Sequence, residues 1–449
     1  HDLEPAGHAG SRMDAGPGNR LDQNGAALEG KNMLRLIEHE QPQLFDAYAA
    51  NGKIPHYSKT HFYGELCRRK GIEIQLVSAR NEADEIAATA LIQWEKSGGE
   101  EYGYLCYGFN LDYTDTETLQ FFATALTELA KRRGAAYLRM ELNIPRIEHE
   151  KDGRIKPGGF NNEFVTAQME ACGYHHLGYT YGYSGNRMSR FTYCLNLDQS
   201  LETIRKQIKH YAAYQKKNIQ RAVSVKLSDA RDLSILVEAE RELAHKLHFL
   251  PKKEKDFRQL MECFPDQARL YVVSANVDQA LSHLKILREQ LICQQEKLIN
   301  AQRLAENQKQ IAALDQEIAE LMRDYQGLGE IKLGAKLIIQ QGEHVYNVNM
   351  YTKKILPNFR AAFALHCAVI EDCWKRGAKT YDFEGVSGAL NPEDPYYGIH
   401  DFKKSFGGEF IEFLGEFDYI QDPQAYQRIL KRQRRRRKLR RGLARVLYR

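Results

Sequence analysis

Apolar and polar residues follow two different periods in the first part of the chain. Between residues 116 and 133 the apolar positions recur every three or four residues and Gly134 follows them, which predicts a helix that ends at a glycine. Four other runs have the length and composition of strands: 72–77, 86–92, 102–109 and 136–142. Strands and helices in this alternation indicate an α/β or α+β fold.

The same order returns near the C-terminal end. Residues 359–376 have helical spacing, Gly377 follows, and residues 379–384 have a strand pattern. Both helix-to-strand joints contain a basic pair, Gly-Ala, a strand and an acid, although any such joint favours a glycine. We interpret the repetition as a duplicated α/β unit, which predicts two similar domains with a cleft between them.

The segment between the two units has a third pattern. Residues 277–326 contain no glycine and no proline, and their apolar residues recur at spacings of three and four among Gln, Glu, Lys and Arg. This predicts a long antiparallel coiled-coil hairpin that turns near residues 306–308. The hairpin is either an arm that contacts tRNA or a partner, or a structural insertion with no chemistry of its own.

Length and composition restrict the class of protein. A chain of 449 residues with 43% hydrophobic and 27% charged residues is expected to form two or three globular domains. No apolar run reaches about 18 residues, and no secretory signal pattern is present. The eight cysteines form no Cys-x-x-Cys pair, which favours buried thiols in a reducing cytosol. Residues 1–32 are expected to be a leader, a tag or disordered, with Met33 as the native start.

Charge is unevenly distributed. The net charge is +5, but residues 431–449 hold eleven basic residues and no acidic one, which leaves −6 for the rest of the chain. Within this tail Leu439, Leu443 and Val446 recur at helical spacing. The pattern favours a basic amphipathic helix on an anionic bilayer, and the alternatives are contact with tRNA phosphates and an unbound tail.

Residues 381–418 contain the candidates for chemistry. Short apolar runs flank two glycine turns and a lysine pair, which predicts a strand, a loop, a basic element and a second strand. On a strand, Asp382 and Glu384 share one face, opposite the aromatic residues. The two carboxylates are candidates for a general base, or they are solvent-facing acids at a sheet edge.

The lysine pair is the second candidate in this stretch. Alternation places Phe402 and Lys404 on one side and Lys403 on the other. One ammonium group is then available to stabilise the oxyanion of an acyl transfer, and a solvated surface is the alternative.

Residues 205–221 form a second basic stretch. Helical spacing places Lys209, Lys216, Lys217 and Arg221 along one rim, so phosphate binding competes with a plain surface helix. The chain contains no Gly-x-Ser-x-Gly, no Walker loop and no Gly-x-Gly-x-x-Gly, and its histidines lack metal-ligand spacing. An acyl donor therefore has to arrive already activated.

Residues 381–388, 398–408 and 415–418 closely resemble the signature of the Fem aminoacyltransferases (the FemABX family). The resemblance extends from about Met33 to Ala425 and is strongest to members with a helical-hairpin insertion. It implies two GNAT-like domains, the second interrupted by the coiled-coil arm. It also implies transfer of an amino acid from aminoacyl-tRNA to the stem-peptide lysine, or the growing cross-bridge, of lipid II or a UDP-linked muropeptide precursor. No metal and no coenzyme A are implied, and the expected location is cytoplasmic, at the inner face of the cell membrane.

The resemblance also assigns roles to residues. Phe402 and Lys403 match a Phe-Lys pair linked to transfer, Arg221 matches a basic position tied to precursor phosphate binding, and Arg68 or Arg69 replaces a second phosphate-binding lysine. Glu141 stands where the family has an aspartate. The candidates for catalysis are Lys403, Phe402, Asp382 and Glu384, and those for substrate binding are Arg221, Arg68, Arg69, Lys217, Glu141 and Tyr381.

The combined patterns divide the chain into five parts. They are a leader, tag or disordered segment (1–32), a first GNAT-like domain (33–198), a second GNAT-like domain (199–276 and 327–425), the coiled-coil arm (277–326) and the basic tail (426–449). Two other functions compete with the family function. One is a coenzyme-A-dependent N-acyltransferase, although no Arg/Gln-x-x-Gly-x-Gly/Ala loop is present. The other is a non-enzymatic RNA-binding adaptor.

Overall fold

A single sheet runs through the centre of the molecule. The computed structural model of the chain describes residues 33–183 and 188–447, so the predicted leader at residues 1–32 lies outside the described residues. The strand order of the 14-stranded sheet is β1-β2-β3-β4-β6-β14-β8-β13-β12-β11-β10-β9, with β5 beside β3 and β7 beside β14. The strands are β1 (Arg35–Ile37), β2 (Glu73–Arg80), β3 (Ile86–Ser97), β4 (Glu100–Leu105), β5 (Phe109–Leu111), β6 (Tyr137–Pro145), β7 (His175–His176), β8 (Phe191–Asn196), β9 (Val223–Ser228), β10 (Ala268–Asn276), β11 (Glu330–Gln341), β12 (His344–Thr352), β13 (Thr380–Val386) and β14 (Glu409–Ile420).

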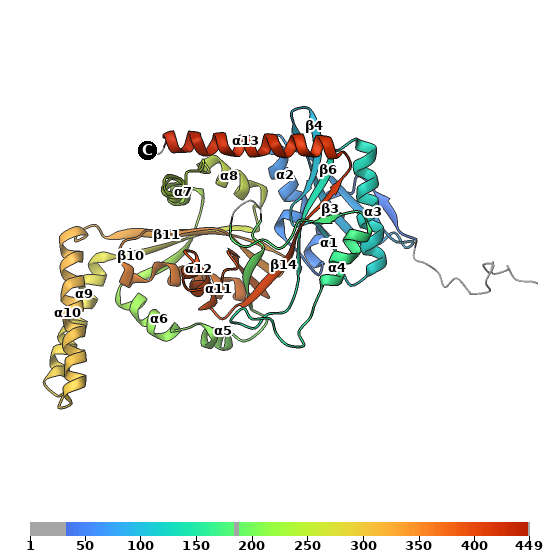
Figure 1. Cartoon of the computed structure of the whole chain (residues 1–449). Helices are drawn as coiled ribbons and strands as arrows, with labels where there is room; N and C mark the ends of the chain where they lie inside the picture. Colours follow the sequence, from blue (N-terminus) through green and yellow to red (C-terminus); the bar gives the residue numbers. More distant parts are fainter. Residues whose placement is uncertain (1–32, 184–187, 448–449) are drawn as a thin grey trace, which may run out of the picture.

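Helices cover both faces of this sheet, and two of them project away from it (Figure 1). They are α1 (Pro42–Asn51), α2 (His61–Arg69), α3 (Thr116–Arg133), α4 (Glu163–Ala171), α5 (Leu201–Gln207), α6 (Tyr211–Gln220), α7 (Leu233–Leu247), α8 (Glu254–Cys263), α9 (Val277–Gln295), α10 (Ala301–Asp324), α11 (Ala361–Lys375), α12 (Tyr397–Lys404) and α13 (Pro423–Leu447). The predicted mixed α/β class is confirmed.

The two halves of the sheet repeat one strand order. In the first half β2, β3 and β4 are antiparallel neighbours, and β4 pairs in parallel with β6. In the second half β10, β11 and β12 are antiparallel neighbours, and β12 pairs in parallel with β13. α3 and α11 make the two parallel crossovers. That each half is GNAT-like stays a prediction.

α3 shows why the sequence pattern predicted its element correctly. Asp115 caps its first turn by accepting a hydrogen bond from the Thr118 N–H, and Gly134 ends it in the left-handed region at φ 73°. The apolar face between these ends, which includes Phe122 and Leu126, is fully buried. Each such side chain contributes about 1.5–3 kcal/mol when it leaves water.

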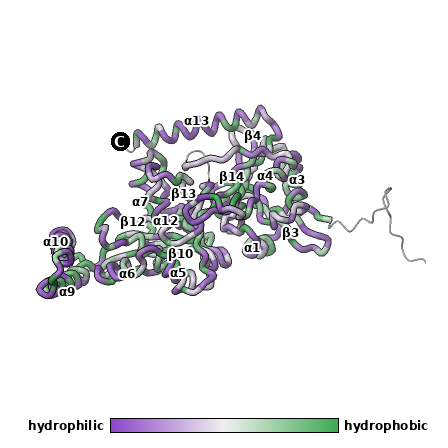
Figure 2. Tube along the Cα trace, turned by 60° about the horizontal axis from the view of Figure 1, so that its bottom comes forward, coloured by the Kyte–Doolittle hydropathy of each residue, from purple (hydrophilic) through white to green (hydrophobic). Residues whose placement is uncertain are grey.

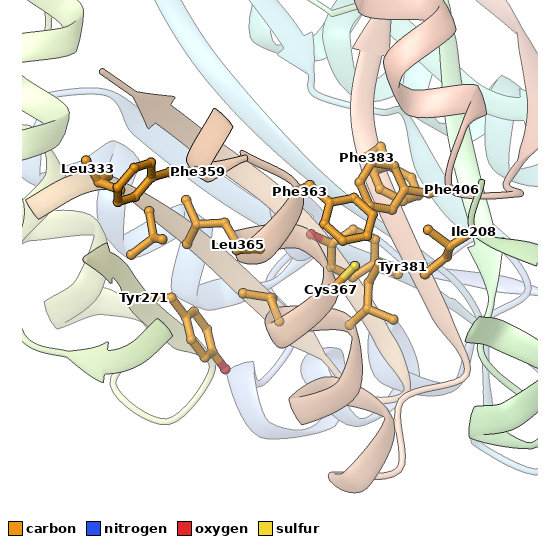
Figure 3. Close-up of a cluster of buried hydrophobic side chains, with 14 of the residues drawn as sticks. Ile208, Tyr271, Leu333, Phe359, Phe363, Leu365, Cys367, Tyr381, Phe383 and Phe406 are labelled. Atoms are coloured by element: carbon orange, nitrogen blue, oxygen red, sulfur yellow. The ribbon is translucent and has the colours of Figure 1, made fainter. Parts of the chain in front are cut away.

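β14 joins the halves, because it pairs with β6 of the first and with β8 of the second. In Figure 1 it runs diagonally between them. The larger hydrophobic core lies in the second half, where α11 packs its Phe363, Leu365 and Cys367 against Tyr381 and other residues near β13 (Figure 3). This packing fixes β13, whose outer residues form the site described below.

The arm consists of α9 and α10, which pack along each other. The chain reverses at residues 296–300, where Asn300 caps α10 by accepting a hydrogen bond from the Arg303 N–H at 3.1 Å. The predicted turn near residues 306–308 is wrong, because these residues lie inside α10. Because residues 277–326 contain no glycine or proline, the helix-capping residue Asn300 was the local sequence signal of the reversal. Supercoiling of the pair stays a prediction.

The basic tail is one helix, α13, which runs through the predicted boundary at residue 426. Tyr426 and Ile429 are buried against the first half, and Arg428 and Arg432 form ion pairs with Glu100. Farther on, Ala444 is fully buried and α13 contacts α7 of the second half. Figure 2 shows mainly hydrophilic colouring along α13, interrupted by hydrophobic positions. Across the described ranges, no helix combines the length and apolar character that crossing a membrane requires.

Candidate active site

β13 contains a bulge in the middle of the sheet. Asp382 is opposite Cys194 of β8 and Gly385 is opposite Thr192, so one extra residue is inserted between them. Glu384 lies at this insertion in the left-handed region, with φ 68°. A non-glycine residue costs about 1–2 kcal/mol in that conformation, so the fold must hold it there. The predicted simple alternation along this strand is therefore broken at Glu384.

The bulge places two carboxyl groups together. Oδ1 of Asp382 accepts hydrogen bonds from the Thr192 hydroxyl at 2.5 Å and from the Glu384 N–H at 2.7 Å. Burial raises the pKa of Asp382. The Glu384 side chain is solvent-accessible because it lies between two cavities. The surrounding protein nevertheless desolvates the carboxyl group and raises the pKa of Glu384 to about 7. Near neutral pH, Glu384 can therefore accept or release a proton.

Lys403 binds the main chain of the bulge. Its Nζ donates hydrogen bonds to the carbonyl oxygens of Glu384 at 2.7 Å and Gly385 at 2.9 Å. Burial lowers the pKa of Lys403, and the neighbouring Glu384 and Asp382 oppose that shift. The predicted strand-like alternation of Phe402, Lys403 and Lys404 is wrong, because these residues lie in helix α12. On a helix they point in three successive directions instead of two.

One of the two cavities lies between the halves of the molecule. It has a volume of about 120 Å³ and is lined by His56, Tyr57, Tyr107, Met188, Ser189, Thr192, Tyr346, Asn347, Asp382, Glu384, Gly385 and Phe413. The ring of His56 lies 3.9 Å from that of Tyr107 and 4.5 Å from that of Tyr346, measured between centroids. The carboxylates from β13 thus face a wall of aromatic rings, most of them from the first half.

The aromatic wall supplies hydrogen-bond donors. The Ser58 N–H donates to Nδ1 of His56 at 3.1 Å, so the ring proton is on Nε2. Burial lowers the pKa of His56 well below its usual value, so the ring is neutral. Burial also raises the pKa of Tyr57 and Tyr107, and neither hydroxyl has a hydrogen-bond partner among the described residues.

A second cavity, of about 520 Å³, lies on the other side of Glu384. α7 contributes Glu240, Glu242 and Lys246 to its lining, and Lys252 and Lys354 add two further ammonium groups. Charged groups of both signs suit a zwitterionic or peptide-like ligand more than a simple anion.

Behind the site, a buried lysine lies beside a buried histidine. Nζ of Lys336 lies 2.6 Å from Nδ1 of His366, and both residues have almost no exposed surface. Desolvation lowers the pKa of Lys336 well below its usual value, and the charge of Lys403 lowers it further. No sequence motif pointed to this pair.

The comparisons with known proteins agree on one family. The sequence model of the FemAB family matches residues 41–431. The chain belongs to the FemAB family. Aminoacyltransferase FemA from Staphylococcus aureus strain MW2 is 25% identical over 392 residues, which cover 83% of this chain and 92% of FemA, and FemA from strain N315 matches equally. A crystal structure of FemX aligns with a TM-score of 0.67 at 19% identity, over 88% of this chain and 99% of FemX, and shows the shared fold.

The resemblance inferred from the sequence is thereby confirmed, and this FemAB protein is an aminoacyltransferase of the group that acts in peptidoglycan cross-bridge synthesis. Of the residues predicted for its site, the fold brings Asp382, Glu384 and Lys403 together, with Phe402 adjacent on α12. The other predicted residues lie elsewhere.

Arg221 is occupied within the protein. Its guanidinium group forms two hydrogen bonds of 2.7 Å to the carboxylate of Glu317 on α10, and both side chains are buried. Asn358 donates to the same carboxylate at 3.2 Å. The predicted rim of basic residues does not form, because His210 breaks the stretch into α5 and α6. In this FemAB chain Arg221 therefore anchors the arm, and phosphate binding by Arg221 stays a prediction.

The remaining predicted residues line neither cavity beside Glu384. Arg68 and Arg69 lie at the end of α2, near Glu65 and Glu262, and Lys217 is half-buried on α6. Glu141 is buried on β6 and accepts a hydrogen bond from the Tyr104 hydroxyl at 2.6 Å. Tyr381 has no exposed surface, and its hydroxyl is 3.3 Å from Nδ1 of His366, so substrate binding by Tyr381 stays a prediction.

Sequence reasoning missed His56, Tyr57 and Tyr107. They are far from the β13 signature in the chain and form no motif. In the structure, Tyr107 and Gly108 both adopt positive φ, and Tyr107 lines the cavity. A tyrosine in that conformation marks a constrained position.

Proposed function

We propose that the protein transfers an amino acid from aminoacyl-tRNA to the stem-peptide lysine, or to the growing cross-bridge, of lipid II. One observation carries the proposal: a carboxyl group with a pKa of about 7 faces a small aromatic cavity between the two halves. Aromatic faces and carboxylates together attract a primary ammonium group, which is the acceptor that such a transfer requires.

The chain supplies the groups that aminolysis needs. Glu384 takes a proton from the acceptor ammonium, and the resulting amine attacks the ester carbonyl of the donor. The new C–N bond forms and the ester C–O bond breaks. A second proton leaves the attacking nitrogen and passes to the departing ribose oxygen, and Glu384 releases the first proton to solvent. The hydroxyls of Tyr57 and Tyr107, which have no hydrogen-bond partner among the described residues, are on the cavity wall and available to stabilise the oxyanion.

In this mechanism Lys403 is a positioning residue. Two of its three N–H donors are used by the carbonyl oxygens of the bulge, so its role is to hold Glu384 in its strained conformation. The proposal thus changes the role expected from the sequence, where Lys403 stabilised the oxyanion directly.

α13 supports a membrane-borne acceptor. Leu439, Leu443 and Val446 are exposed along the helix, among arginine and lysine residues. Exposed apolar residues beside cations match the surface of an anionic bilayer. We therefore place the protein in the cytoplasm, peripheral to the inner face of the membrane, with lipid II rather than the UDP-linked precursor as acceptor.

The test is transfer of label. Radiolabelled aminoacyl-tRNA is incubated with the protein and either lipid II or the UDP-linked muropeptide, with and without ribonuclease. We expect ribonuclease-sensitive label on lipid II. Label that requires acyl-coenzyme A instead would replace the donor, and RNA binding without any transfer would make the protein an adaptor.

A further inference from the structure

A second buried lysine lies in the first half, in the segment that carries part of the aromatic wall. Lys59 ends a 3₁₀ turn that begins at Tyr57, and only 2% of its surface is exposed. Its Nζ donates hydrogen bonds to the carbonyl oxygens of Ile54 and Phe109, each at 2.9 Å, and to Oδ1 of Asn143 at 2.7 Å. Within the described part of the chain, no carboxylate forms an ion pair with Lys59.

The three acceptors require the charged form of this lysine. An ammonium group has three N–H donors, whereas a neutral amine has two and would direct its lone pair at one of the three oxygen atoms. Burial lowers the pKa of Lys59 well below its ordinary value, because an ammonium group loses its hydration there. The hydrogen bonds to three oxygen atoms offset that loss, so the lysine depends on these partners and they depend on it.

Lys59 joins segments that are distant in the sequence. One acceptor, Ile54, begins the segment 54–59, and another, Phe109, is the first residue of β5. The third acceptor, Asn143, is on β6. The rings of the wall that come from the first half belong to that segment and to the turn before β5: His56, Tyr57 and Tyr107. Lys59 therefore fastens both parts of the wall to the sheet.

The second half contacts the same segment. The hydroxyl of Tyr346 on β12 donates to the Pro55 carbonyl oxygen at 2.6 Å. Tyr346 is also the partner of Asp382 in the register between β12 and β13. The segment that Lys59 holds is thus connected through one side chain to the strand of the two carboxyl groups.

The two sides of the cavity are held in the same way. Lys403 binds two main-chain carbonyl oxygens of the bulge that carries Glu384, and Lys59 binds two main-chain carbonyl oxygens beside the aromatic wall. Both lysines are buried. A buried ammonium group with carbonyl partners fixes the main chain in place, and the side chains attached to that main chain are fixed with it.

We propose that Lys59 is a positioning residue for the transfer reaction, which holds the hydroxyls of Tyr57 and Tyr107 on the wall that faces Glu384. This inference rests on the proposed function. A hydroxyl stabilises an oxyanion only from within hydrogen-bond distance, so a displacement of the wall by about 1 Å is expected to slow transfer about 10²-fold. The charge of Lys59 has a separate effect: burial lowers the pKa of His56, and this charge lowers it further.

The test combines hydrogen exchange with kinetics on the full chain. Lys59→Met keeps an apolar side chain of similar length and removes the three donors. We expect amide exchange in residues 54–60 and 107–111 to become at least about tenfold faster, because both segments lose the same anchor. The kcat for transfer should fall about 10²-fold, while the KM for the acyl donor changes by less than about threefold.

Three further variants isolate the cause. Leu270→Ala removes a buried side chain from a separate hydrophobic cluster on β10, so it should lower stability and leave kcat and the exchange of both segments unchanged. Asn143→Asp keeps the oxygen acceptor and neutralises the charge of Lys59, so both segments should stay protected and kcat should stay within about threefold. Asn143→Leu removes one acceptor of the three and should produce the changes of Lys59→Met at a smaller size. It provides the test if Lys59→Met does not fold.

The outcomes separate the anchor from the function. Unchanged exchange in both segments of Lys59→Met overturns the inference, and so does an unchanged kcat when the segments have become mobile. A fall in kcat in Asn143→Asp as large as that in Lys59→Met, with both segments still protected, assigns the effect to charge and also overturns positioning. If the wild type transfers no label, the proposed function fails, and the exchange data alone decide whether Lys59 holds the wall.

Discussion

Lys403 holds Glu384 by its main chain, since Nζ lies 2.7 Å from the Glu384 carbonyl oxygen. The ammonium group of one residue thereby fixes the carboxylate of the other at an inserted position of β13. This relationship connects α12 to Glu384, which lines the cavities of about 120 Å³ and about 520 Å³.

Replacement of Lys403 should lower both the stability of the fold and the rate of transfer. We expect Lys403→Ala to lower the free energy of unfolding by about 1–3 kcal/mol, because two buried carbonyl oxygens lose their donor. Transfer should fall with it. Thermal denaturation and initial transfer rates check this, with Lys404→Ala as the control. Full stability and full activity in Lys403→Ala would remove it from the site.

The rate of transfer should depend on the ionisation of Glu384. Its pKa of about 7 means that the basic form grows as the pH rises through 7, so the rate should rise in the same interval. Glu384→Gln should lower the rate about 10²–10⁴-fold and abolish this pH step. Glu393→Gln, in an exposed loop, is the control. If Glu384→Gln keeps the rise in rate near pH 7, another group is responsible for the pH dependence.

The same pKa has a consequence for stability. The folded pKa of about 7 lies above the ordinary value of 4.5, so the stability contributed by protonated Glu384 is present at low pH and is lost as the pH rises through 7. Glu384→Gln should therefore be more stable than the wild type at pH 8, and the difference should shrink toward pH 4.5. Urea denaturation at both pH values measures it. An equal difference at both would contradict the shift.

The left-handed conformation of Glu384 predicts different effects on stability for two small replacement residues. Glu384→Gly removes the Cβ and should stabilise the fold by about 0.5–1 kcal/mol after the entropy cost of glycine. Glu384→Ala keeps the Cβ and should gain nothing from relief of that strain. Both should lose transfer. Chemical denaturation at pH 6, combined with rate assays, distinguishes strain from chemistry, and equal stability of the two variants would count against strain.

The Arg221–Glu317 pair should be structural. Removal of either partner alone should cost about 3–5 kcal/mol, because a buried charge is left unpaired, whereas Arg221→Met with Glu317→Leu should be close to neutral. Denaturation of the two single variants and the double variant gives their free energies of unfolding and completes a double-mutant cycle. If Arg221→Ala stays stable but raises the KM for the acceptor, the expected phosphate contact is correct after all.

Membrane contact should depend on the exposed apolar residues of α13. Changing Leu439, Leu443 and Val446 to Gln should weaken binding to vesicles with anionic lipid by at least about tenfold and leave the fold intact, since all three are exposed. Sedimentation with phosphatidylcholine–phosphatidylglycerol vesicles tests this, and pure phosphatidylcholine is the control. Equal binding of the wild type and the variant to anionic vesicles would contradict a membrane contact through these residues.

Sequence patterns located most elements, and the reasons are local. Periodicity and end signals determined α3, α11 and the strands that follow them, because spacing and a left-handed glycine act within a few residues. The same rules misplaced the reversal between α9 and α10, where an asparagine cap took the place of glycine or proline. They also assigned alternation to Lys403 and Lys404, because eight residues are too few to establish a helical period.

The sequence by itself determined the α/β class, the repeated helix-to-strand unit, the family and the Asp382, Glu384 and Lys403 signature. Only the tertiary structure decided what those groups do. It inserted a residue into β13, brought His56 and Tyr107 across from the other half, and paired Arg221 with Glu317. Such relationships depend on contacts between distant segments and on the exclusion of water around them, and neither is encoded in the spacing of neighbouring residues.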